Sequence, residues 1–274
     1  GKIFENFINK TYEELIDDKK IDAIYISTLN NTHINLIKKI IKTGKKILCE
    51  KPVSTYHKEL MEVNELVLDH NIQFYEAIAY YSHQQTTDLL NLINNDEIGE
   101  IKSIESNFGY KAKFKPSSRV FDKLLGGGSI FDLGCYPLSF LMLFTEDPKK
   151  IVIKSKKLNY AKSGVDDDAK ADLNYNNKFE AKIHVSIKDN LDNICIIRGS
   201  KGSIKISEPW KPGINSTLEI TNNKHFYVKS VNSKLSVYAN QIEKVSESFF
   251  DQSKKLNLFD IEKSLINMKL MSNW

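Results

Sequence analysis

The sequence predicts an α/β protein with a parallel sheet in its first part and a mainly antiparallel, open sheet in its second. Up to about residue 95, short β-branched runs alternate with helical patterns of roughly 10 to 15 residues, which is typical of parallel strands joined by crossover helices. From about Gly99, apolar and polar residues alternate along several segments, which is typical of an antiparallel sheet with one solvated face. We therefore expect two domains, residues 1–95 and 96–274, of which the second is an α/β domain.

Capping residues and periodicity define the elements of the first domain. A helix is expected after Thr11, because Glu14 completes a capping box with it. Another helix is expected to end at Gly44, since glycine commonly terminates helices. The predicted strands are almost wholly apolar, which suits a sheet covered on both faces. The strands are expected at 22–28, 46–50 and 72–76, and the helices between them at 32–43 and 55–70.

The second domain is predicted to carry six alternating strands. They are expected at 100–110, 151–158, 169–175, 179–187, 193–199 and 203–207. An apolar helix, 138–144, interrupts the sheet, and helical spacing returns at 238–274, in helices that can pack back on the first domain. We expect Ile183, Val185 and Ile187 to lie on an open sheet face that packs against a second copy, in a homodimer or higher homo-oligomer.

Composition argues against several functional classes. The chain is 41% hydrophobic, which is enough for a sizeable core, and Lys and Arg exceed Asp and Glu by only 39 to 35 with no long basic run, so no nucleic-acid partner is expected. No apolar segment approaches roughly 18 residues and the N-terminus lacks a signal-peptide layout, so we expect no membrane association and a cytoplasmic location. The three cysteines are far apart and lack metal-ligand spacing, and Asp166–Asp168 is expected to be a solvated loop, so no metal is predicted.

The stretch Ile47–Ser54, ILCEKPVS, ends an apolar run with Glu50, Lys51 and Pro52. One interpretation is a strand end with solvated charges, followed by a helix that starts at Pro52, because proline is favoured at the first helical position. The other interpretation is that Lys51 is held at the carboxyl end of a parallel strand. That edge of an open α/β sheet is where ligands bind.

A second stretch, Gly126–Phe140, reads GGGSIFDLGCYPLSF. Three successive glycines permit a close backbone approach and unusual torsions. Asp132 and Tyr136 lie four residues apart and would share one face of a helix. A plain interpretation also exists, in which Asp132 is a satisfied helix cap and Tyr136 is a core aromatic.

Taken together, the two stretches resemble the glucose-fructose oxidoreductase and inositol dehydrogenase family, Gfo/Idh/MocA, and the resemblance runs from Tyr12 to the C-terminus. It rests on Thr28-Leu-Asn30 with His33, Glu50-Lys51-Pro52, Glu76-Ala77, and Gly126-Gly-Gly-Ser-Ile-Phe-Asp132-Leu-Gly-Cys-Tyr136. The tyrosine at position 136, followed by Pro137-Leu138, is most similar to the branch of dimeric dihydrodiol dehydrogenases and sugar 1-dehydrogenases.

The resemblance implies a Rossmann domain followed by an α/β domain whose open sheet forms a substrate wall and a subunit interface. It also implies hydride transfer between the nicotinamide of NAD or NADP and a small-molecule substrate, a sugar or diol. A phenol helped by a nearby ammonium suits the removal of a hydroxyl proton, and the implied catalytic residues are Lys51, Asp132 and Tyr136. Lys51 would lower the pKa of Tyr136 by favouring its anion, and Asp132 would orient the substrate hydroxyl or the lysine.

Further site residues are implied by the same resemblance. The implied cofactor-binding residues are Thr28, Asn30, His33, Glu50 and Lys51, and the implied substrate-binding residues are Arg119, Tyr81 and Trp210. His33 also fits a surface residue at a helix start. Tyr81 stands where relatives often carry an arginine. Trp210, between two prolines, also fits a loop aromatic that packs over the sheet.

The resemblance also implies that the opening Rossmann strand, its Gly-x-Gly-x-x-Gly turn and the first helix would precede Gly1, which makes the first domain N-terminally incomplete. A dinucleotide is held chiefly by backbone amides at that helix, so we expect the residues as written to bind NAD(H) or NADP(H) weakly or not at all. The main expectation is an NAD(P)-dependent dehydrogenase that uses Tyr136. The alternatives are a non-catalytic sugar- or nucleotide-sensing protein of the same fold, and a partial chain that is inactive without its upstream segment.

Overall fold

The computed structural model describes residues 8–223, 225–251, 253–254 and 256–274. Its smaller sheet has three parallel strands in the order β1-β2-β3. These strands are β1 (Ala23–Ile26), β2 (Lys46–Cys49) and β3 (Phe74–Glu76). Ile24 pairs with Ile47, and Ile47 pairs with Phe74. The predicted parallel sheet is therefore confirmed.

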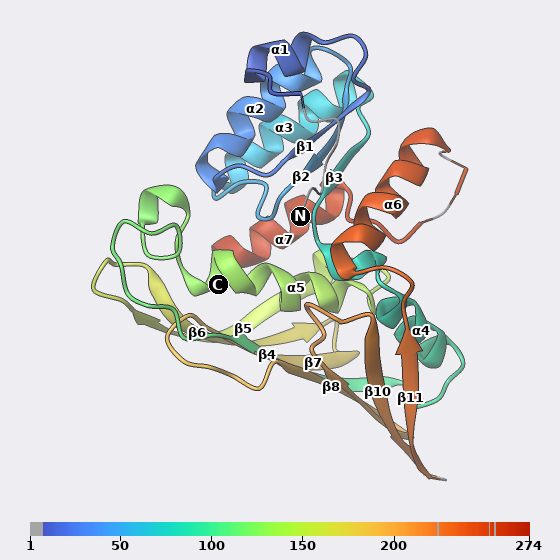
Figure 1. Cartoon of the computed structure of the whole chain (residues 1–274). Coiled ribbons are helices and arrows are strands. Elements are labelled where there is room, and N and C mark those ends of the chain that lie inside the picture. Colours follow the sequence, from blue (N-terminus) through green and yellow to red (C-terminus); the bar gives the residue numbers. More distant parts are fainter. Residues whose placement is uncertain (1–7, 224, 252, 255) are drawn as a thin grey trace, which may run out of the picture.

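Helices lie on both sides of this smaller sheet (Figure 1). α2 (His33–Ile41) and α3 (His57–Asp69) pack on one face, and α6 (Val237–Phe250) packs on the other through Val245 and Phe249. The short α1 (Tyr12–Asp17) begins with the predicted capping box, in which the Glu14 N–H donates to the Thr11 hydroxyl and the Thr11 N–H donates to the Glu14 carboxylate.

The larger sheet has eight strands in the order β11-β10-β9-β8-β4-β7-β6-β5. Neighbouring strands are antiparallel except β4 and β7, which run parallel. The strands are β4 (Ile101–Gly109), β5 (Ile151–Tyr160), β6 (Asp166–Tyr175), β7 (Phe179–Ser186), β8 (Ile194–Gly199), β9 (Gly202–Ser207), β10 (Asn215–Asn222) and β11 (Phe226–Asn232). β10 and β11 were not predicted. β11 fully buries only Val231.

One face of the larger sheet is covered by α5 (Cys135–Met142) and α7 (Ile261–Asn273), and α4 (Gln84–Asn94) lies beside β10 and β11 (Figure 1). Ile183, Val185 and Ile187 belong to the covered face and are 2% exposed or less. The expectation that they form an open face is therefore wrong. In an alternating strand, the apolar residues are the ones that the core buries.

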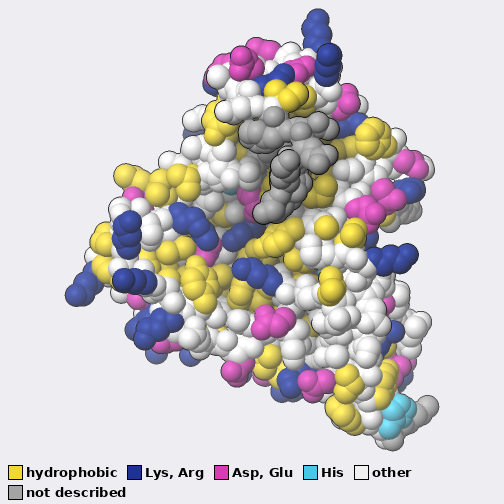
Figure 2. Space-filling view, in the orientation of Figure 1, with side chains coloured by type: hydrophobic (Ala, Val, Ile, Leu, Met, Phe, Trp, Pro, Cys, Tyr) yellow, Lys and Arg dark blue, Asp and Glu magenta, His cyan; other side chains and the backbone are white. Residues whose placement is uncertain are grey.

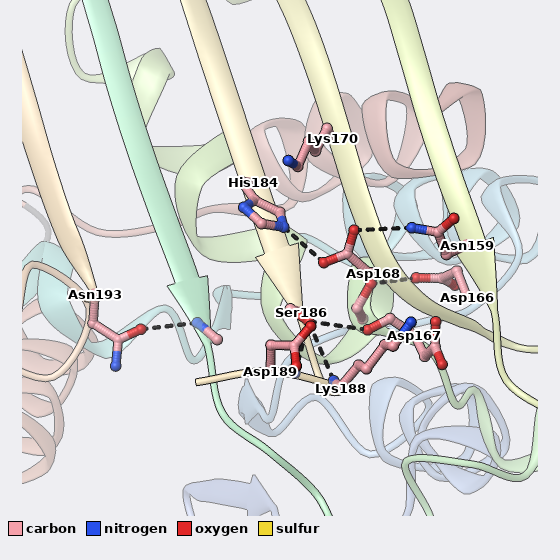
Figure 3. A network of polar contacts seen from close by, with 12 residues as sticks. Asn159, Asp166, Asp167, Asp168, Lys170, His184, Ser186, Lys188, Asp189 and Asn193 are labelled. Carbon is pink, nitrogen blue, oxygen red and sulfur yellow. Dashed lines mark hydrogen bonds and ion pairs between the residues drawn. The ribbon is translucent and has the colours of Figure 1, made fainter. Parts of the chain in front are cut away.

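The acidic run Asp166–Asp168 begins β6, so the expectation of a solvated loop is also wrong. Figure 3 shows Asp168 directed towards Asn159 and His184 of the neighbouring strands. Asn159 Nδ2 donates to Asp168 Oδ1 at 3.2 Å, and His184 Nε2 lies 2.7 Å from Asp168 Oδ2. The pairing of β6 with both neighbours draws these side chains into cross-strand contacts. Among the described residues, no group of three or more His, Cys, Asp or Glu side chains could hold a metal ion.

One segment, Lys123–Met142, is long and apolar enough to cross a membrane by length and composition, which was not predicted. However, 83% of its most apolar window is buried inside the protein. Before α5, the segment includes two short helices, η3 (Lys123–Leu125) and η4, a π-helix over Ile130–Gly134, joined by the glycine turn. It thus packs as a core segment between the two sheets.

The C-terminal segment connects the two sheets. Tyr75 of β3 forms an isolated antiparallel bridge with Asp260, just before α7. Gln73 Nε2 donates to Ser248 O of α6 at 2.9 Å, and Trp274 Nε1 donates to Lys170 O of β6 at 3.0 Å. These contacts fix the position of β3 relative to β6. As a result, the carboxyl ends of β1 and β2 lie next to α5.

Candidate active site

Lys51 lies at the carboxyl edge of the smaller sheet. β2 ends at Cys49, the Glu50 N–H still donates to Ile26 O at 2.8 Å, and the chain then leaves the sheet. The Lys51 side chain is only 14% exposed, and its Nζ donates to Asp132 O at 2.6 Å and lies 3.5 Å from Asp132 Oδ1. The interpretation of Lys51 as a solvated charge is wrong, and α3 begins at His57, not at Pro52.

Asp132 is the anionic centre of this cluster. It lies in the π-helix that continues directly into α5. Arg119 Nη1 donates to Oδ1 at 2.8 Å, and the Tyr110 hydroxyl donates to Oδ2 at 2.7 Å. Burial alone would raise the pKa of Asp132, but Lys51, Arg119 and the hydrogen bonds from Arg119 and Tyr110 lower it to about 2. Both carboxylate oxygens of Asp132 thus contact protein donors.

Tyr136 follows Asp132 by one helical turn and packs against Lys51. The Lys51 Nζ lies 5.0 Å from the centroid of the Tyr136 ring, and Phe108 meets the ring edge-on at 5.3 Å. Within the described part of the chain, the Tyr136 hydroxyl has no hydrogen-bond partner, and the residue is 7% exposed. Burial raises the pKa of Tyr136, and Lys51 acts in the opposite direction. Lys51 therefore has the expected effect on the pKa of Tyr136, but desolvation is larger and the pKa is raised overall.

The glycine turn lies close to the loops that follow β1 and β2 of the smaller sheet. Gly126 has φ +74°, and a Cβ there would lie 2.3 Å from Thr55 Cγ2 and 3.3 Å from Asn30 Nδ2. A side chain at this position would therefore push the turn away from both loops. The close approach brings Asn30, from the first part of the chain, beside the segment that carries Asp132.

Asp166 fixes the start of the π-helix. The Ser129 hydroxyl donates to Asp166 Oδ2 at 2.6 Å, and the Ile130 N–H donates to the same oxygen at 2.8 Å. Burial raises the pKa of Asp166. Gly128 (φ +121°) makes room for this carboxylate, since a Cβ there would lie 2.3 Å from Asp166 Oδ1.

Four of the predicted cofactor residues share the carboxyl edge of the smaller sheet. Thr28 and Asn30 follow β1, whereas Glu50 and Lys51 follow β2. The Tyr25 hydroxyl donates to Glu50 Oε1. Thr28, Asn30 and Glu50 are half-buried, so their polar groups remain accessible at this edge.

His33 has a different place from the one predicted. It is fully buried, with Nδ1 3.1 Å from Pro52 O and Nε2 3.2 Å from Thr28 O. Burial lowers the pKa of His33. His33 therefore ties the loop after β1 to the Pro52 turn. Both earlier interpretations, a surface residue and a direct cofactor contact, are wrong.

Of the predicted substrate residues, Arg119 lies at the site and the other two lie in the core. The Arg119 side chain is 55% exposed while it contacts Asp132. Tyr81 is 2% exposed, and its hydroxyl donates to Ser139 O at 2.6 Å. Trp210 is 1% exposed, and its Nε1 donates to Asn107 O at 2.9 Å. Burial leaves Tyr81 and Trp210 no surface for a substrate, so those two expectations are wrong.

Three residues near Lys51 were missed as site residues. Tyr110 directly follows β4 and Glu76 ends β3, and a polar residue at the carboxyl end of a strand is a signal that could have found both. Glu76 entered the sequence argument only as part of a motif. Tyr25 lies within β1, and nothing in its sequence context marks it.

Two family models match consecutive parts of the chain. The model described as "Oxidoreductase family, NAD-binding Rossmann fold" matches residues 3–97, and the model "GFO/IDH/MocA C-terminal domain" matches residues 87–205.

Curated proteins are similar over the same region. A trans-1,2-dihydrobenzene-1,2-diol dehydrogenase from Xenopus tropicalis is 32% identical over 205 residues, which are 74% of this chain and 61% of that protein. A D-xylose 1-dehydrogenase (NADP(+)) from Haloferax volcanii is 26% identical over 211 residues, or 77% of this chain and 64% of that protein. The chain thus spans about three fifths of the length of the curated relatives it matches.

Solved structures share the fold at low sequence identity. One is a 3-ketoreductase from Actinomadura kijaniata in complex with NADP and TDP-benzene, which is 20% identical to this chain. The two superpose with a TM-score of 0.85 over 96% of this chain and 80% of the ketoreductase. An aldose-aldose oxidoreductase from Caulobacter crescentus, complexed with glycerol, is 16% identical with a TM-score of 0.85, covering 96% and 78%. Since the two family models together match residues 3–205, with the motifs that form the Lys51 cluster inside this range, the chain belongs to the Gfo/Idh/MocA family of oxidoreductases.

Proposed function

We propose that this protein is an NAD(P)-dependent dehydrogenase that transfers a hydride between nicotinamide and a hydroxyl-bearing carbon of a sugar or diol. The observation that carries the proposal is the position of the Lys51 ammonium, 5.0 Å from the Tyr136 ring centroid and 2.6 Å from Asp132 O. A phenol beside a fixed ammonium is a suitable acid–base pair for interconverting an alcohol and a carbonyl. The relatives' names, a dihydrodiol dehydrogenase and a xylose dehydrogenase, support the substrate class.

In the proposed reaction, Tyr136 handles the proton. During oxidation its oxygen takes the hydroxyl proton of the alcohol, and during reduction its hydroxyl gives a proton to the carbonyl oxygen. When bound, a nicotinamide cofactor accepts or supplies the hydride. Lys51 stabilises the phenolate form of Tyr136, and Asp132 holds Lys51. Because burial raises the pKa of Tyr136, the neutral phenol prevails at neutral pH. This favours reduction there and oxidation at alkaline pH.

The residues proposed to hold the nicotinamide half, NAD or NADP alike, are Thr28, Asn30, Glu50 and Lys51. The chemistry of this donor set fits, because a hydroxyl, an amide, a carboxylate and an ammonium can meet ribose hydroxyls and a carboxamide. The absence of a side chain at Gly126 also fits, because a Cβ there would lie 3.3 Å from the Asn30 amide.

We further propose a domain boundary near residue 95, a cytoplasmic location and a homodimer. The boundary is supported by the end of α4 at Asn94 and the start of the larger sheet at Ile101. The three free, buried cysteines fit a reducing compartment. The homodimer is supported by the face of the larger sheet opposite α5, where β6 and β7 present Lys170 and Lys182 beside Asp172 in a self-complementary pattern of charges.

A turnover assay tests the proposal. The full-length protein is incubated with NAD⁺ or NADP⁺ and either D-xylose or trans-1,2-dihydrobenzene-1,2-diol, and the absorbance of reduced nicotinamide is followed. Turnover with one of the two substrates and one of the two cofactors is expected. Binding of sugar or nucleotide by calorimetry with no turnover in any combination would contradict the proposal and support a non-catalytic sensing protein.

A further inference from the structure

Glu76 is a buried carboxyl group behind Lys51. It ends β3, is 3% exposed, and its N–H donates to Phe259 O at 2.8 Å. The next residue, Ala77, donates its N–H to Cys49 O at 2.7 Å. The backbone of Glu76 and of Ala77 is thus fixed, the latter to the last residue of β2.

The contacts of Glu76 lead to the turn that carries Lys51. The Val53 N–H donates to Glu76 Oε1 at 3.3 Å. Within the described ranges, no lysine, arginine or histidine lies within ion-pair distance of its carboxylate. Two buried side chains therefore hold the turn Lys51–Val53: His33, which contacts Pro52 O, and Glu76, which accepts from the Val53 N–H.

Charged or titratable groups near Glu76 lie on β2, on the turn after β2 and on α5. Lys51 attracts its ionised form and Glu50 repels it, both from the turn after β2. Cys49 of β2 and Cys135 of α5 are the other titratable neighbours, and both thiols are kept neutral by burial. From α7, the Ser264 hydroxyl favours the ionised form of Glu76, while it donates its hydrogen bond to Asp260 O at 3.0 Å. Lys51 is thus the one cation among these neighbours.

We propose that Glu76 is a positioning residue, whose ionised carboxylate tightens the Lys51–Val53 turn and steadies the Lys51 ammonium against Asp132 and Tyr136. The carboxylate is the stronger acceptor for the Val53 N–H and adds an attractive charge behind Lys51. The neutral acid loses both effects. This inference rests on the proposed function only for its turnover readout.

Burial raises the pKa of Glu76 to about 7. A carboxyl group with a raised pKa in the folded state contributes stability below its ordinary pKa, and that contribution is lost as the pH rises through about 7. The ionised form is therefore costly for stability but useful for positioning. Glu76→Gln, which keeps the size and an acceptor for Val53, should be more heat-stable than the natural protein at about pH 8 and equally stable at about pH 4.

The test has two readouts, one of which needs no catalysis. The first is labelling of Lys51 by an amine-selective reagent, read by peptide mass spectrometry and normalised to the exposed Lys115. In the natural protein the normalised labelling should fall as the pH rises from about 6 to 8, whereas in Glu76→Gln it should stay high and flat. The second is turnover, where Glu76→Gln should lose about 10-fold in kcat/KM at pH 8 and lose the inflection near pH 7.

Two further variants serve as controls for Glu76→Gln. Glu62→Gln makes the same chemical change on the exposed face of α3, where Glu62 pairs with Lys38 at 2.8 Å, and it should match the natural protein in both readouts. Glu76→Asp retains the charge and should recover the pH dependence of Lys51 labelling. If Glu76→Gln shows the natural labelling profile, or if it is less stable than the natural protein at pH 8, the inference is overturned. Should the protein lack turnover altogether, the labelling readout still decides the role of Glu76.

Discussion

Lys51 and Tyr136 meet although one follows a strand of the smaller sheet and the other lies on a helix that covers the larger sheet. The Lys51 Nζ is 5.0 Å from the Tyr136 ring centroid, and the Asp132 carbonyl and carboxylate fix the ammonium in that place. This arrangement requires the two sheets to be held rigidly against each other. The predictions below test the parts of that arrangement separately.

Gly126→Ala should weaken cofactor binding. The new Cβ would lie 2.3 Å from Thr55 Cγ2, so the glycine turn must move away from Asn30. Gly44→Ala is a matched control, because Gly44 has φ +75° and no atom within 4 Å of the added Cβ. Both variants should lose roughly 1 kcal/mol of unfolding free energy from left-handed backbone. Only Gly126→Ala should lose about tenfold in NADPH affinity, measured by fluorescence titration, and equal affinities would show that the turn does not shape the site.

Asp132→Asn should remove an acid-sensitive part of the stability. The pKa of Asp132 is lowered to about 2, from 3.8 ordinarily. The ionised group therefore contributes stability above about pH 4, and this contribution is lost as the pH falls towards 2. The variant should be roughly 2 kcal/mol less stable at pH 7, and the difference should vanish near pH 2. Urea unfolding across this range measures it. The exposed Asp69→Asn serves as control, and a difference that persists at pH 2 would contradict the account.

Lys51→Met should shift the pH profile of oxidation. Lys51 acts to lower the pKa of Tyr136 against the effect of burial, so removing the ammonium raises that pKa further. The rising limb of kcat against pH should move to higher pH, and the rate at pH 8 should fall by about 100-fold. Lys102→Met, which removes an exposed lysine paired with Glu100, should leave the profile in place. A lower rate with an unshifted profile would mean that Lys51 does not act on Tyr136.

Local patterns were sufficient to predict most of the fold. Thr11 with Glu14 gave the start of α1, and the apolar runs around Ile24, Ile47 and Phe74 gave the parallel sheet. β11 was missed because this edge strand buries only Val231, and β10, which pairs with β9 and β11, was missed with it. Alternation also does not show whether another element covers the apolar face of a sheet, and for this reason the face that carries Ile183 and Val185 was expected to be open although it is covered.

The site residues that belong to a sequence motif could be predicted. Lys51, Asp132 and Tyr136 come together, but only a folded chain shows that Asp132 also contacts Arg119 and Tyr110. The burial of Tyr81 and the reversed pKa shift of Tyr136 depend on desolvation, which arises from side chains distant in sequence. Those effects cannot be derived from local spacing.

The most direct test of the account is the kcat/KM of Tyr136→Phe with the cofactor and substrate that give turnover. Phenylalanine keeps the ring contact with Phe108 and removes a hydroxyl that has no hydrogen-bond partner among the described residues, so the melting temperature should be unchanged. Tyr81→Phe is the matched control, since it removes a buried hydroxyl that donates to Ser139 O, and it should cost about 1 kcal/mol of stability with turnover intact. The account predicts that Tyr136→Phe loses at least about 100-fold in kcat/KM with normal cofactor affinity. A rate equal to that of the natural protein would contradict it.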